Sequence, residues 1–147
     1  MLLGTHRAKL DDKGRLTLPG KWIQEFSEGL ILTRGVDQSL LIFPASKFQS
    51  IATSIDRLGI ERADVRKWAR FMSAQAVDLE PDKKGRIPIS SAQLKFAGIA
   101  NDVVLVGVLG YVQVWDPQKY IASESIDLSV MNQIAERVDH LLRSSVA

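Results

Sequence analysis

Residues 11–16 read Asp-Asp-Lys-Gly-Arg-Leu, and residues 82–87 read Asp-Lys-Lys-Gly-Arg-Ile. The shared pattern is Asp-x-Lys-Gly-Arg followed by an apolar residue, at an offset of 71 positions from residue 11 to residue 82. An internal repeat sets the unit of a fold, so it is sought first. Because a single short match arises by chance, the repeat depends on whether the flanking elements recur as well.

The elements around each motif do recur in the same order. After each motif the sequence predicts a short helix, then an apolar strand, then a second apolar strand. One such unit is too small to bury a good core alone, so we expect both copies to close a single small barrel. The predicted helices are 21–26 and 91–97, and the predicted strands are 30–35, 40–44, 103–107 and 111–115.

Three further helices are predicted outside the two copies. Ser46 and Gln49 have capping-box spacing before a first helix that Gly59 can end, and Asp64 is predicted to cap a second. A third amphipathic helix is predicted near the C-terminus. Their apolar faces contain Phe48, Ile51, Ala52, Ile55 and Leu58; Val65, Trp68, Ala69 and Met72; and Leu128, Met131, Ile134, Ala135, Val138, Leu141 and Leu142.

The composition indicates an ordinary globular protein. Of the 147 residues, 46% are hydrophobic and 24% charged, with a net charge of only +2. The absence of cysteine excludes disulfides, thiolate metal sites and a cysteine nucleophile. The longest apolar run, 103–112, is far short of a membrane span, and the N-terminus lacks a signal-peptide pattern. We expect a cytoplasmic protein that does not contact a membrane.

Each repeated motif has the residues of a tight turn. Asp11 and Gly14, like Asp82 and Gly85, occupy the first and fourth turn positions that these residue types prefer. An aspartate can accept hydrogen bonds from the backbone of its own turn, and glycine tolerates a positive φ where the chain re-enters a strand. These four residues are therefore predicted to form the turns of two hairpins.

The cations of the motif are candidates for DNA contact. Lys13, Arg15, Lys84 and Arg86 recur at matched places, although the sequence shows a folding reason only for the aspartate and the glycine. The simpler interpretation is that they are solvated, or that Arg15 pairs with Asp11 or Asp12; the recurrence favours DNA. Arg7, Lys9 and Lys21 add charge near the first copy, and Lys83 and Lys95 near the second, where only Asp82 is counted against them.

The chemistry of these side chains suits DNA. Lysine and arginine neutralise phosphates and release counterions, which supplies most of the affinity. Arginine can also donate two hydrogen bonds to guanine O6 and N7, which supplies specificity. Paired β-elements can enter the major groove.

Residues 5–19, Thr-His-Arg-Ala-Lys-Leu-Asp-Asp-Lys-Gly-Arg-Leu-Thr-Leu-Pro, closely resemble the opening of MraZ proteins. Residues 79–89 and 103–115 resemble the second repeat of that family, so the resemblance covers about residues 1–120. MraZ proteins belong to the wider AbrB-like (SpoVT-AbrB) group of swapped-hairpin DNA-binding folds. The resemblance implies an α+β, mainly β fold: a swapped-hairpin barrel formed by two tandem repeats within the chain, with flanking helices.

The resemblance also implies a function. It implies a sequence-specific transcriptional regulator, usually a repressor of the division and cell-wall gene cluster that includes its own gene. The implied partners are double-stranded DNA with short direct repeats and further copies of the chain in a ring, in a cytoplasmic protein associated with the nucleoid. No cofactor, metal or small-molecule substrate is implied. The DNA-contacting residues of the family correspond here to Lys13, Arg15, Lys84 and Arg86, and we add Arg7, Lys9 and Lys83 as candidates.

Two features depart from the family pattern. Ser90 stands where the first copy has Pro19, and Pro88 lies inside the predicted strand, so the second hairpin is expected to differ in shape. The stretch from about residue 121 matches nothing in the family and is a candidate for assembly. The expected segments are a first repeat at 5–47, a helical connector at 48–75, a second repeat at 76–119 and a C-terminal helical extension at 120–147.

Three other functions compete with DNA binding. An enzyme has little support, because His6 and His140 are far apart in sequence and no catalytic motif is present. An AbrB-like antitoxin that binds a protein partner is the stronger alternative, although such proteins have one copy of the fold and a disordered tail. A scaffold whose apolar surfaces drive oligomerisation is the third, with Trp22, Phe43, Trp68 and Trp115 as candidate contacts.

Overall fold

The computed structural model describes residues 1–145 and divides the chain into two compact units, with the boundary between Pro117 and Gln118. The last two residues of the extension predicted at 120–147 lie outside the described residues. In order, the elements are β1 (Leu2–Lys9), β2 (Arg15–Thr17), the 3₁₀ helix η1 (Gly20–Phe26), β3 (Leu30–Arg34), β4 (Leu40–Pro44), α1 (Ala45–Asp56), α2 (Ala63–Ser73), β5 (Val77–Leu79), β6 (Arg86–Pro88), α3 (Ser91–Ala97), β7 (Asp102–Leu109), β8 (Val112–Trp115), α4 (Pro117–Ser123) and α5 (Leu128–Ser145).

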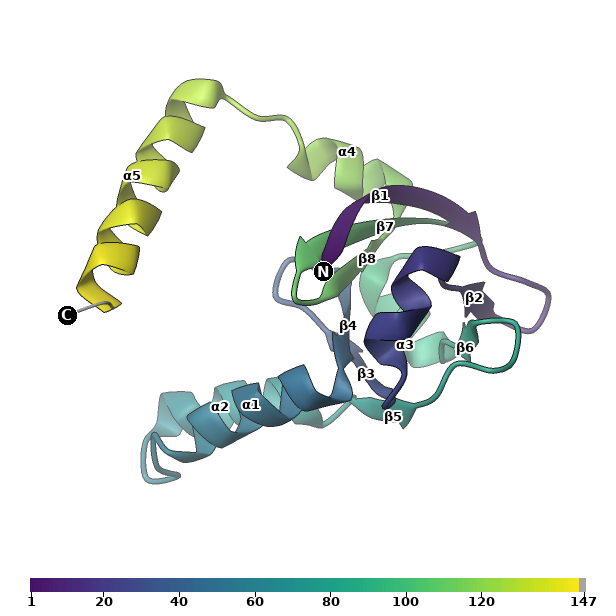
Figure 1. Cartoon of the computed structure of the whole chain (residues 1–147), viewed down its shortest axis with the longest axis horizontal. Helices are drawn as coiled ribbons and strands as arrows, with labels where there is room; N and C mark the ends of the chain where they lie inside the picture. Colours follow the sequence, from purple (N-terminus) through teal and green to yellow (C-terminus); the bar gives the residue numbers. More distant parts are fainter. Residues whose placement is uncertain (146–147) are drawn as a thin grey trace. The chain divides into compact units, whose positions relative to one another are not determined.

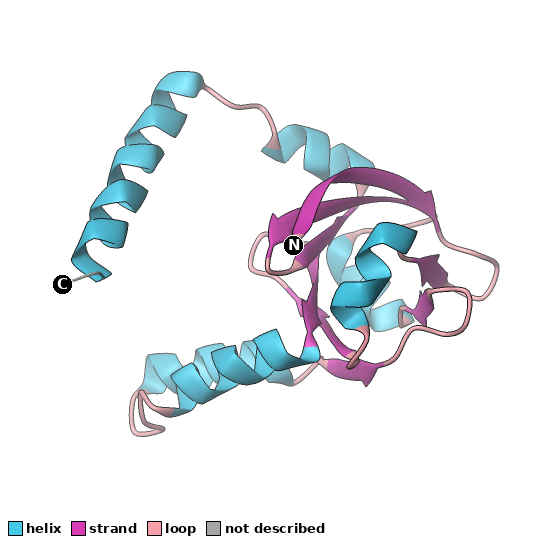
Figure 2. Cartoon of the chain, viewed as in Figure 1, coloured by secondary structure: helices cyan, strands magenta, loops and turns pink. Residues whose placement is uncertain are grey.

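The strands of the two repeats, drawn in magenta in Figure 2, interleave in their pairing. A six-stranded antiparallel sheet has the order β1-β7-β8-β4-β3-β5, and β2 pairs with β6 in a separate two-stranded sheet. The first strand of each copy therefore pairs with the third strand of the other copy, as β1 with β7 and β5 with β3. The mixed α+β architecture with two repeats is confirmed. Within residues 1–145 the sheet does not close, since β1 and β5 are its edges, so the swapped-hairpin barrel stays a prediction.

The core is built from matched apolar positions of both copies. Leu16 and Leu18 follow the first turn, Ile87 and Ile89 follow the second, and all four are buried. Full burial of such a side chain contributes about 1.5–3 kcal/mol, so these pairs make each copy depend on the other for stability. The core also contains Leu2, Trp22, Phe26, Leu30, Leu32, Leu40, Ile42, Ala97, Ile99, Val103, Leu105, Val112 and Val114.

One matched pair in the core differs in chemistry. Trp22 and Gln93 are equivalent by the offset of 71, and each is no more than 3% exposed. The Trp22 ring packs edge-on against His6, with 4.7 Å between ring centroids. Gln93 donates from Nε2 to the carbonyl of Gln75 at 3.2 Å, and its Oε1 accepts from the backbone N–H of Ser90 at 3.1 Å. The buried amide is thus hydrogen-bonded, as a buried polar group must be.

The short helices of the two copies begin differently. Pro19 precedes η1, and its fixed φ suits the start of a helix without a side-chain cap. Ser90 forms a capping box with Gln93 at the start of α3, and Gly98 ends that helix at φ 67°. Where the first copy has Pro19, the second copy has Ser90, and each residue suits the start of the helix that follows it. The two predicted helices are confirmed, the first as a 3₁₀ helix.

The predicted caps of α1 and α2 are wrong. The first helical residue of α1 is Ala45, directly after Pro44, and the structure shows no capping bond from a side chain there. Proline already sets the backbone for the helix start, so Ser46 falls inside the first turn. Asp64 likewise lies inside the first turn of α2 and pairs with Arg62 at 3.1 Å. Helix α1 ends at Asp56, before Gly59.

The second unit contains most of α4 and all of α5. Helix α5 confirms the predicted C-terminal helix, and none of its described residues is buried. Across the described residues, no helix is long and apolar enough to cross a membrane.

Replacing Gly107 by alanine should destabilise the protein by roughly 1–3 kcal/mol, the usual cost of overpacking. Gly107 lies opposite Gly4 in the β1–β7 pair, and an added Cβ would lie 2.5 Å from the backbone N of Leu3. Urea unfolding measures the change. The control is Gly20→Ala, where an added Cβ meets nothing within 4 Å. Equal stability of the two variants would show that β1 moves aside without cost.

Candidate nucleic-acid interface

The two motif turns lie side by side although they are 71 residues apart (Figure 1). Strands β2 and β6 pair so that Leu16 is opposite Ile87 and Arg15 is opposite Pro88. The backbone N–H of Leu18 donates to the carbonyl of Gly85 at 2.8 Å, and that of Ile89 donates to the carbonyl of Gly14 at 3.1 Å. Each turn is therefore fastened to the strand of the other copy, and both turns project from one small sheet.

An aspartate closes each turn from inside. Asp11 Oδ1 accepts from the backbone N–H groups of Lys13 and Arg15, both at 2.9 Å. Asp11 Oδ2 accepts from Arg15 Nε at 2.7 Å, so one carboxylate holds two backbone groups and a guanidinium. The backbone N–H of Gly14 donates to the carbonyl of Asp11 at 2.9 Å, and Gly14 takes φ 72°, which favours glycine.

The second turn has the same bonds at the same lengths. Asp82 Oδ1 accepts from Lys84 and Arg86 at 2.9 Å, and Asp82 Oδ2 accepts from Arg86 Nε at 2.7 Å. The expectation that Pro88 gives this hairpin a different shape is wrong. Hydrogen-bonded positions alternate along an antiparallel pair, and the 18–85 and 14–89 bonds place Pro88 at a non-bonded position, where its missing N–H costs nothing.

These bonds explain the electrostatics of both aspartates. The backbone N–H of Arg15 is the largest influence that holds the pKa of Asp11 below its usual range, and desolvation opposes it. The Arg15 guanidinium and the N–H of Lys13 also lower that pKa. The pKa of Asp82 is lowered in the same way, first by the backbone N–H of Arg86. Each turn therefore favours the carboxylate form of its aspartate.

The arginines have a folding role, and the pairing of Arg15 with Asp11 that the simpler interpretation allowed is confirmed. Arg15 and Arg86 each give Nε to the aspartate of their own turn, and their side chains are only 30% and 25% exposed. The inference that the motif cations lack a folding reason is therefore wrong for the arginines. The aspartate fixes the plane of each guanidinium through Nε, which leaves the terminal nitrogens for other acceptors.

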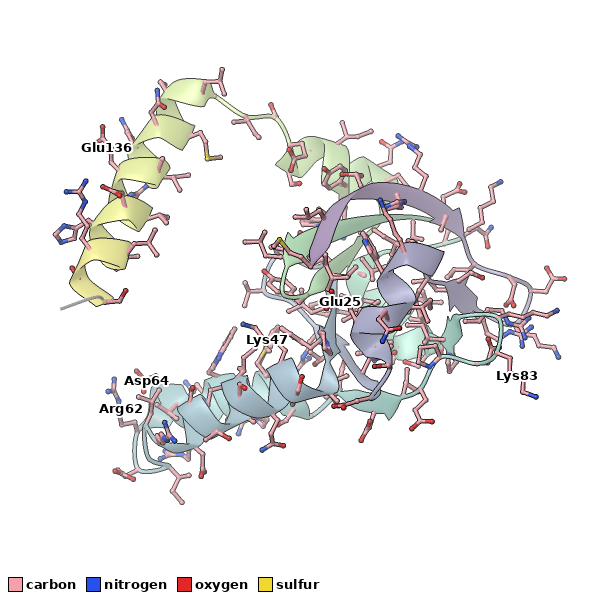
Figure 3. All side chains as sticks on the ribbon, in the orientation of Figure 1. Glu25, Lys47, Arg62, Asp64, Lys83 and Glu136 are labelled. Atoms are coloured by element: carbon pink, nitrogen blue, oxygen red, sulfur yellow. The ribbon has the colours of Figure 1, made fainter. Side chains whose placement is uncertain are left out.

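The lysines of the turns are different. Lys13, Lys83 and Lys84 are exposed, and within residues 1–145 their amino groups take part in no hydrogen bond or ion pair. Figure 3 shows Lys83 projecting from its loop away from the ribbon. A freely solvated ammonium group can approach a phosphate without first losing a protein partner.

The strands behind the two turns carry opposite charges. Arg7 and Lys9 are exposed on β1, where Lys9 Nζ lies 3.8 Å from Asp102 in a well-solvated pair of little energetic value. The equivalent positions of the second copy are Asp78 and Glu80, also exposed. The expectation that only Asp82 opposes the second set of cations therefore missed these two acids. Aligning the whole chain at the offset of 71 reveals them.

The charges at the loop tips differ in the opposite direction from those on the strands. Asp12 in the first tip corresponds to Lys83 in the second. The first copy thus has a mixed tip and a basic strand, whereas the second has a basic tip and an acidic strand. The two hairpins share a backbone geometry but present different charges.

A family model described as "MraZ protein, putative antitoxin-like" matches the chain twice, over residues 1–71 and 72–141. The chain belongs to the MraZ family. The length of the first match equals the offset between the Asp-x-Lys-Gly-Arg motifs, so the family unit and the internal repeat coincide. The second match extends to residue 141, so the expectation that the stretch from about residue 121 matches nothing in the family is wrong.

Named relatives agree with this assignment. The "Transcriptional regulator MraZ" of Mycobacterium ulcerans (strain Agy99) is 37% identical over 120 residues, which cover 82% of this chain and 84% of the relative. The protein of the same name from Saccharopolyspora erythraea is 35% identical over 120 residues, with the same coverage. That of Corynebacterium glutamicum (strain R) is 37% identical over 122 residues, covering 83% of this chain and 85% of the relative. Transcriptional regulators are not a class of enzymes.

Acid should loosen both turns at a pH below the usual titration range of aspartate. A lowered pKa in the folded state means that the stabilising contribution is complete above the ordinary aspartate pKa and is lost as the pH falls through the folded value. Carboxyl ¹³C NMR should give midpoints for Asp11 and Asp82 below that ordinary value, together with movement of the Lys13 and Lys84 amide signals.

In Asp11→Asn the first titration should disappear while that of Asp82 persists, which assigns the two signals. Midpoints within or above the ordinary aspartate range would contradict the bonding described for the turns.

Proposed function

We propose that this MraZ-family chain is a sequence-specific DNA-binding transcriptional regulator that contacts double-stranded DNA through its two hairpins. The observation that carries the proposal is the pairing of β2 with β6, because it places two turns of matched geometry, each with a free lysine, next to each other. The names of the relatives support a regulator of transcription.

The two kinds of cation are proposed to have different roles. Lys13, Lys83 and Lys84 at the tips, with Arg7 and Lys9 on β1, bind phosphates and supply salt-dependent affinity. Arg15 and Arg86 contact base edges, since a guanidinium whose plane is already fixed loses less freedom when it donates two hydrogen bonds to guanine. Asp11, Gly14, Asp82 and Gly85 form the turns and do not contact DNA.

The finer proposal follows the family resemblance. The regulator represses the division and cell-wall gene cluster that includes its own gene, binds short direct repeats upstream of it, and forms a ring-shaped homo-oligomer in the cytoplasm, at the nucleoid. Its strands close as an AbrB-like swapped-hairpin barrel. The segments are the repeats at 5–47 and 76–119, the connector at 48–75 and the extension at 120–147, and interleaved pairing of the copies supports the two-repeat part.

A protein-interaction module is the second candidate function. The description of the matched family includes the words "antitoxin-like", and α1 and α2 leave an apolar hollow open on the surface. An antitoxin-type protein would bind a protein partner in addition to DNA. Because both candidates allow DNA binding, they separate on whether the protein also binds a protein partner.

The double variant Lys13→Ala, Lys84→Ala should bind DNA taken from upstream of its own gene more weakly while remaining folded. Neither amino group has a protein partner among residues 1–145, so removing it should cost little stability. The log–log slope of affinity against salt should become shallower by about 0.9 for each phosphate that the variant no longer binds. Fluorescence anisotropy titrations at several salt concentrations measure both quantities.

Lys67→Ala, on the exposed face of α2, is the matched control and should leave affinity and slope unchanged. Wild-type affinity and slope in the double variant would reject the hairpins as the DNA-binding surface. Shuffled DNA tests specificity: if the wild type binds it equally well, the protein is not a sequence-specific regulator.

The charge difference between the tips gives a second test. Asp12→Lys makes the first tip resemble the second and should tighten binding, and Lys83→Asp should weaken it, because each change alters the charge near phosphates by two units in opposite directions. Neither side chain closes a turn, so both variants should unfold like the wild type. The same titrations apply. If both variants change the affinity in the same direction, or neither changes it, an electrostatic contact at the tips is excluded.

A further inference from the structure

One face of the paired strands β2 and β6 is turned away from the core. Leu16 and Ile87 are fully buried, and successive side chains of a strand point to opposite faces, so the residues on either side of these two lie on the outer face. Thr17 and Pro88 are exposed there and are not part of the core. We call this surface the ribbon face, and it consists of Arg15, Thr17, Arg86 and Pro88.

The register of the two strands gives each arginine a different neighbour. Thr17 is opposite Arg86, and Pro88 is opposite Arg15. The backbone hydrogen bonds that fasten the turns fall at alternate positions, so both of these pairs are non-hydrogen-bonded pairs. Side chains approach each other most closely in such pairs, with Cβ atoms roughly 4.5–5.5 Å apart. A group that meets either arginine therefore also meets the residue opposite it.

Thr17 and Pro88 occupy equivalent positions of the two copies, because 17 and 88 differ by the offset of 71. The copies share the turn, its aspartate and its arginine, but they differ at the second residue after the arginine. Threonine offers a hydroxyl group and a methyl group, whereas proline offers only the methylene groups of its ring. The ribbon face thus combines a shared backbone and matched arginines with two different neighbouring side chains.

The hydroxyl of Thr17 is available to a ligand. Within residues 1–145 it takes part in no hydrogen bond. Threonine is common on exposed strands because it is β-branched, so its presence alone indicates no function. What distinguishes Thr17 is its position beside the Arg86 guanidinium, which Asp82 already orients through a 2.7 Å bond to Nε. An oriented donor group and a free hydroxyl therefore lie next to each other on one exposed face.

We propose that Thr17 and Pro88 determine sequence specificity by contacting the base pair next to the guanine that each neighbouring arginine binds. This inference rests on the proposed function, because it requires the ribbon face to meet base edges in the major groove. The Thr17 hydroxyl forms a hydrogen bond with a base edge, and the Pro88 ring packs against the methyl group of thymine. A Cβ separation of roughly 4.5–5.5 Å is less than two base-pair steps of about 3.4 Å, so the adjacent base pair is within reach.

The first test selects binding sequences from a pool of double-stranded DNA with a randomised central segment, and the bound DNA is sequenced. The wild type should enrich two guanines and a preferred base beside each. Thr17→Val keeps the β-branched shape without the hydroxyl, so it should lose one of these two neighbouring preferences and keep the other. In anisotropy titrations with the selected DNA, its affinity should fall roughly 2- to 12-fold, the equivalent of one neutral hydrogen bond. Its salt slope should stay unchanged, because no phosphate contact is lost.

Pro88→Thr gives both arginines the same neighbour. The register leaves the new backbone N–H outside the hydrogen bonds between the strands, so the hairpin should form as before. The preferred base should then be the same beside both guanines, since a protein surface with two-fold symmetry favours a site with that symmetry. A purely structural role of Pro88 could change the affinity, but it would not change which base is selected.

Thr5→Val is the matched control, because Thr5 is also an exposed threonine in a strand but lies on β1, outside the ribbon face. This variant should select the wild-type sequence. Thr17→Ser keeps the hydroxyl and should keep the preference, whereas Thr17→Ala should lose it, so the test does not depend on a single variant. Circular dichroism and urea unfolding show which variants are folded.

Folded variants of Thr17 without the hydroxyl that still select the wild-type sequence would overturn the role of Thr17, and the same result for Pro88→Thr would overturn that of Pro88. Sequence-specific binding would stand in both cases. A wild type that enriches no sequence would overturn this inference and the proposed function together. The Lys13→Ala, Lys84→Ala variant should bind more weakly but select the same bases, which separates contacts with phosphates from contacts with bases.

Discussion

The carboxylate of Asp11, with its counterpart Asp82, is the interaction on which the functional part of the molecule depends. Each carboxylate accepts two backbone N–H groups and one arginine Nε–H, so a single side chain determines the course of a turn and the plane of a guanidinium. Hydrogen bonds to a charged acceptor are about twice as strong as neutral ones, which suits a loop with little apolar area of its own. The residues of the motif therefore hold the shape of the turn, whether or not DNA is bound.

The pairing of the two copies supplies what a single copy lacks. Strands β2 and β6 have only three residues each, and a two-stranded ribbon of that length is marginal in water. Here Leu16, Leu18, Ile87 and Ile89 direct both strands into a core that contains the long β1–β7 pair. The turns are held out from this core by their strands, and they occur together because neither copy can form its part of the core alone.

The sequence predicted the order of elements well, because the offset of 71 aligns the motif, the short helix and the strands that follow. It allowed a pair between Arg15 and Asp11 but favoured DNA contact instead, since an exposed cation is equally compatible with solvent, and only the 2.7 Å bonds to the aspartates show that both arginines close their own turns. It misjudged Pro88, because the effect of a proline depends on the hydrogen-bonding register across the pair. The caps of α1 and α2 were misplaced for a similar reason, as Pro44 starts α1 where a serine was expected to do so.

Trp22 and Gln93 show what it means for both copies to reside in one polypeptide. In a dimer of identical chains, a substitution at this position would appear in both copies, so both sites would have to accept an indole or both an amide. A single chain changes one side at a time, so an aromatic contact with His6 can coexist with an amide bonded to Gln75. The halves are consequently no longer interchangeable: a gene in which one half were copied over the other would place an indole among the hydrogen-bond partners of Gln93, or an amide against the ring of His6.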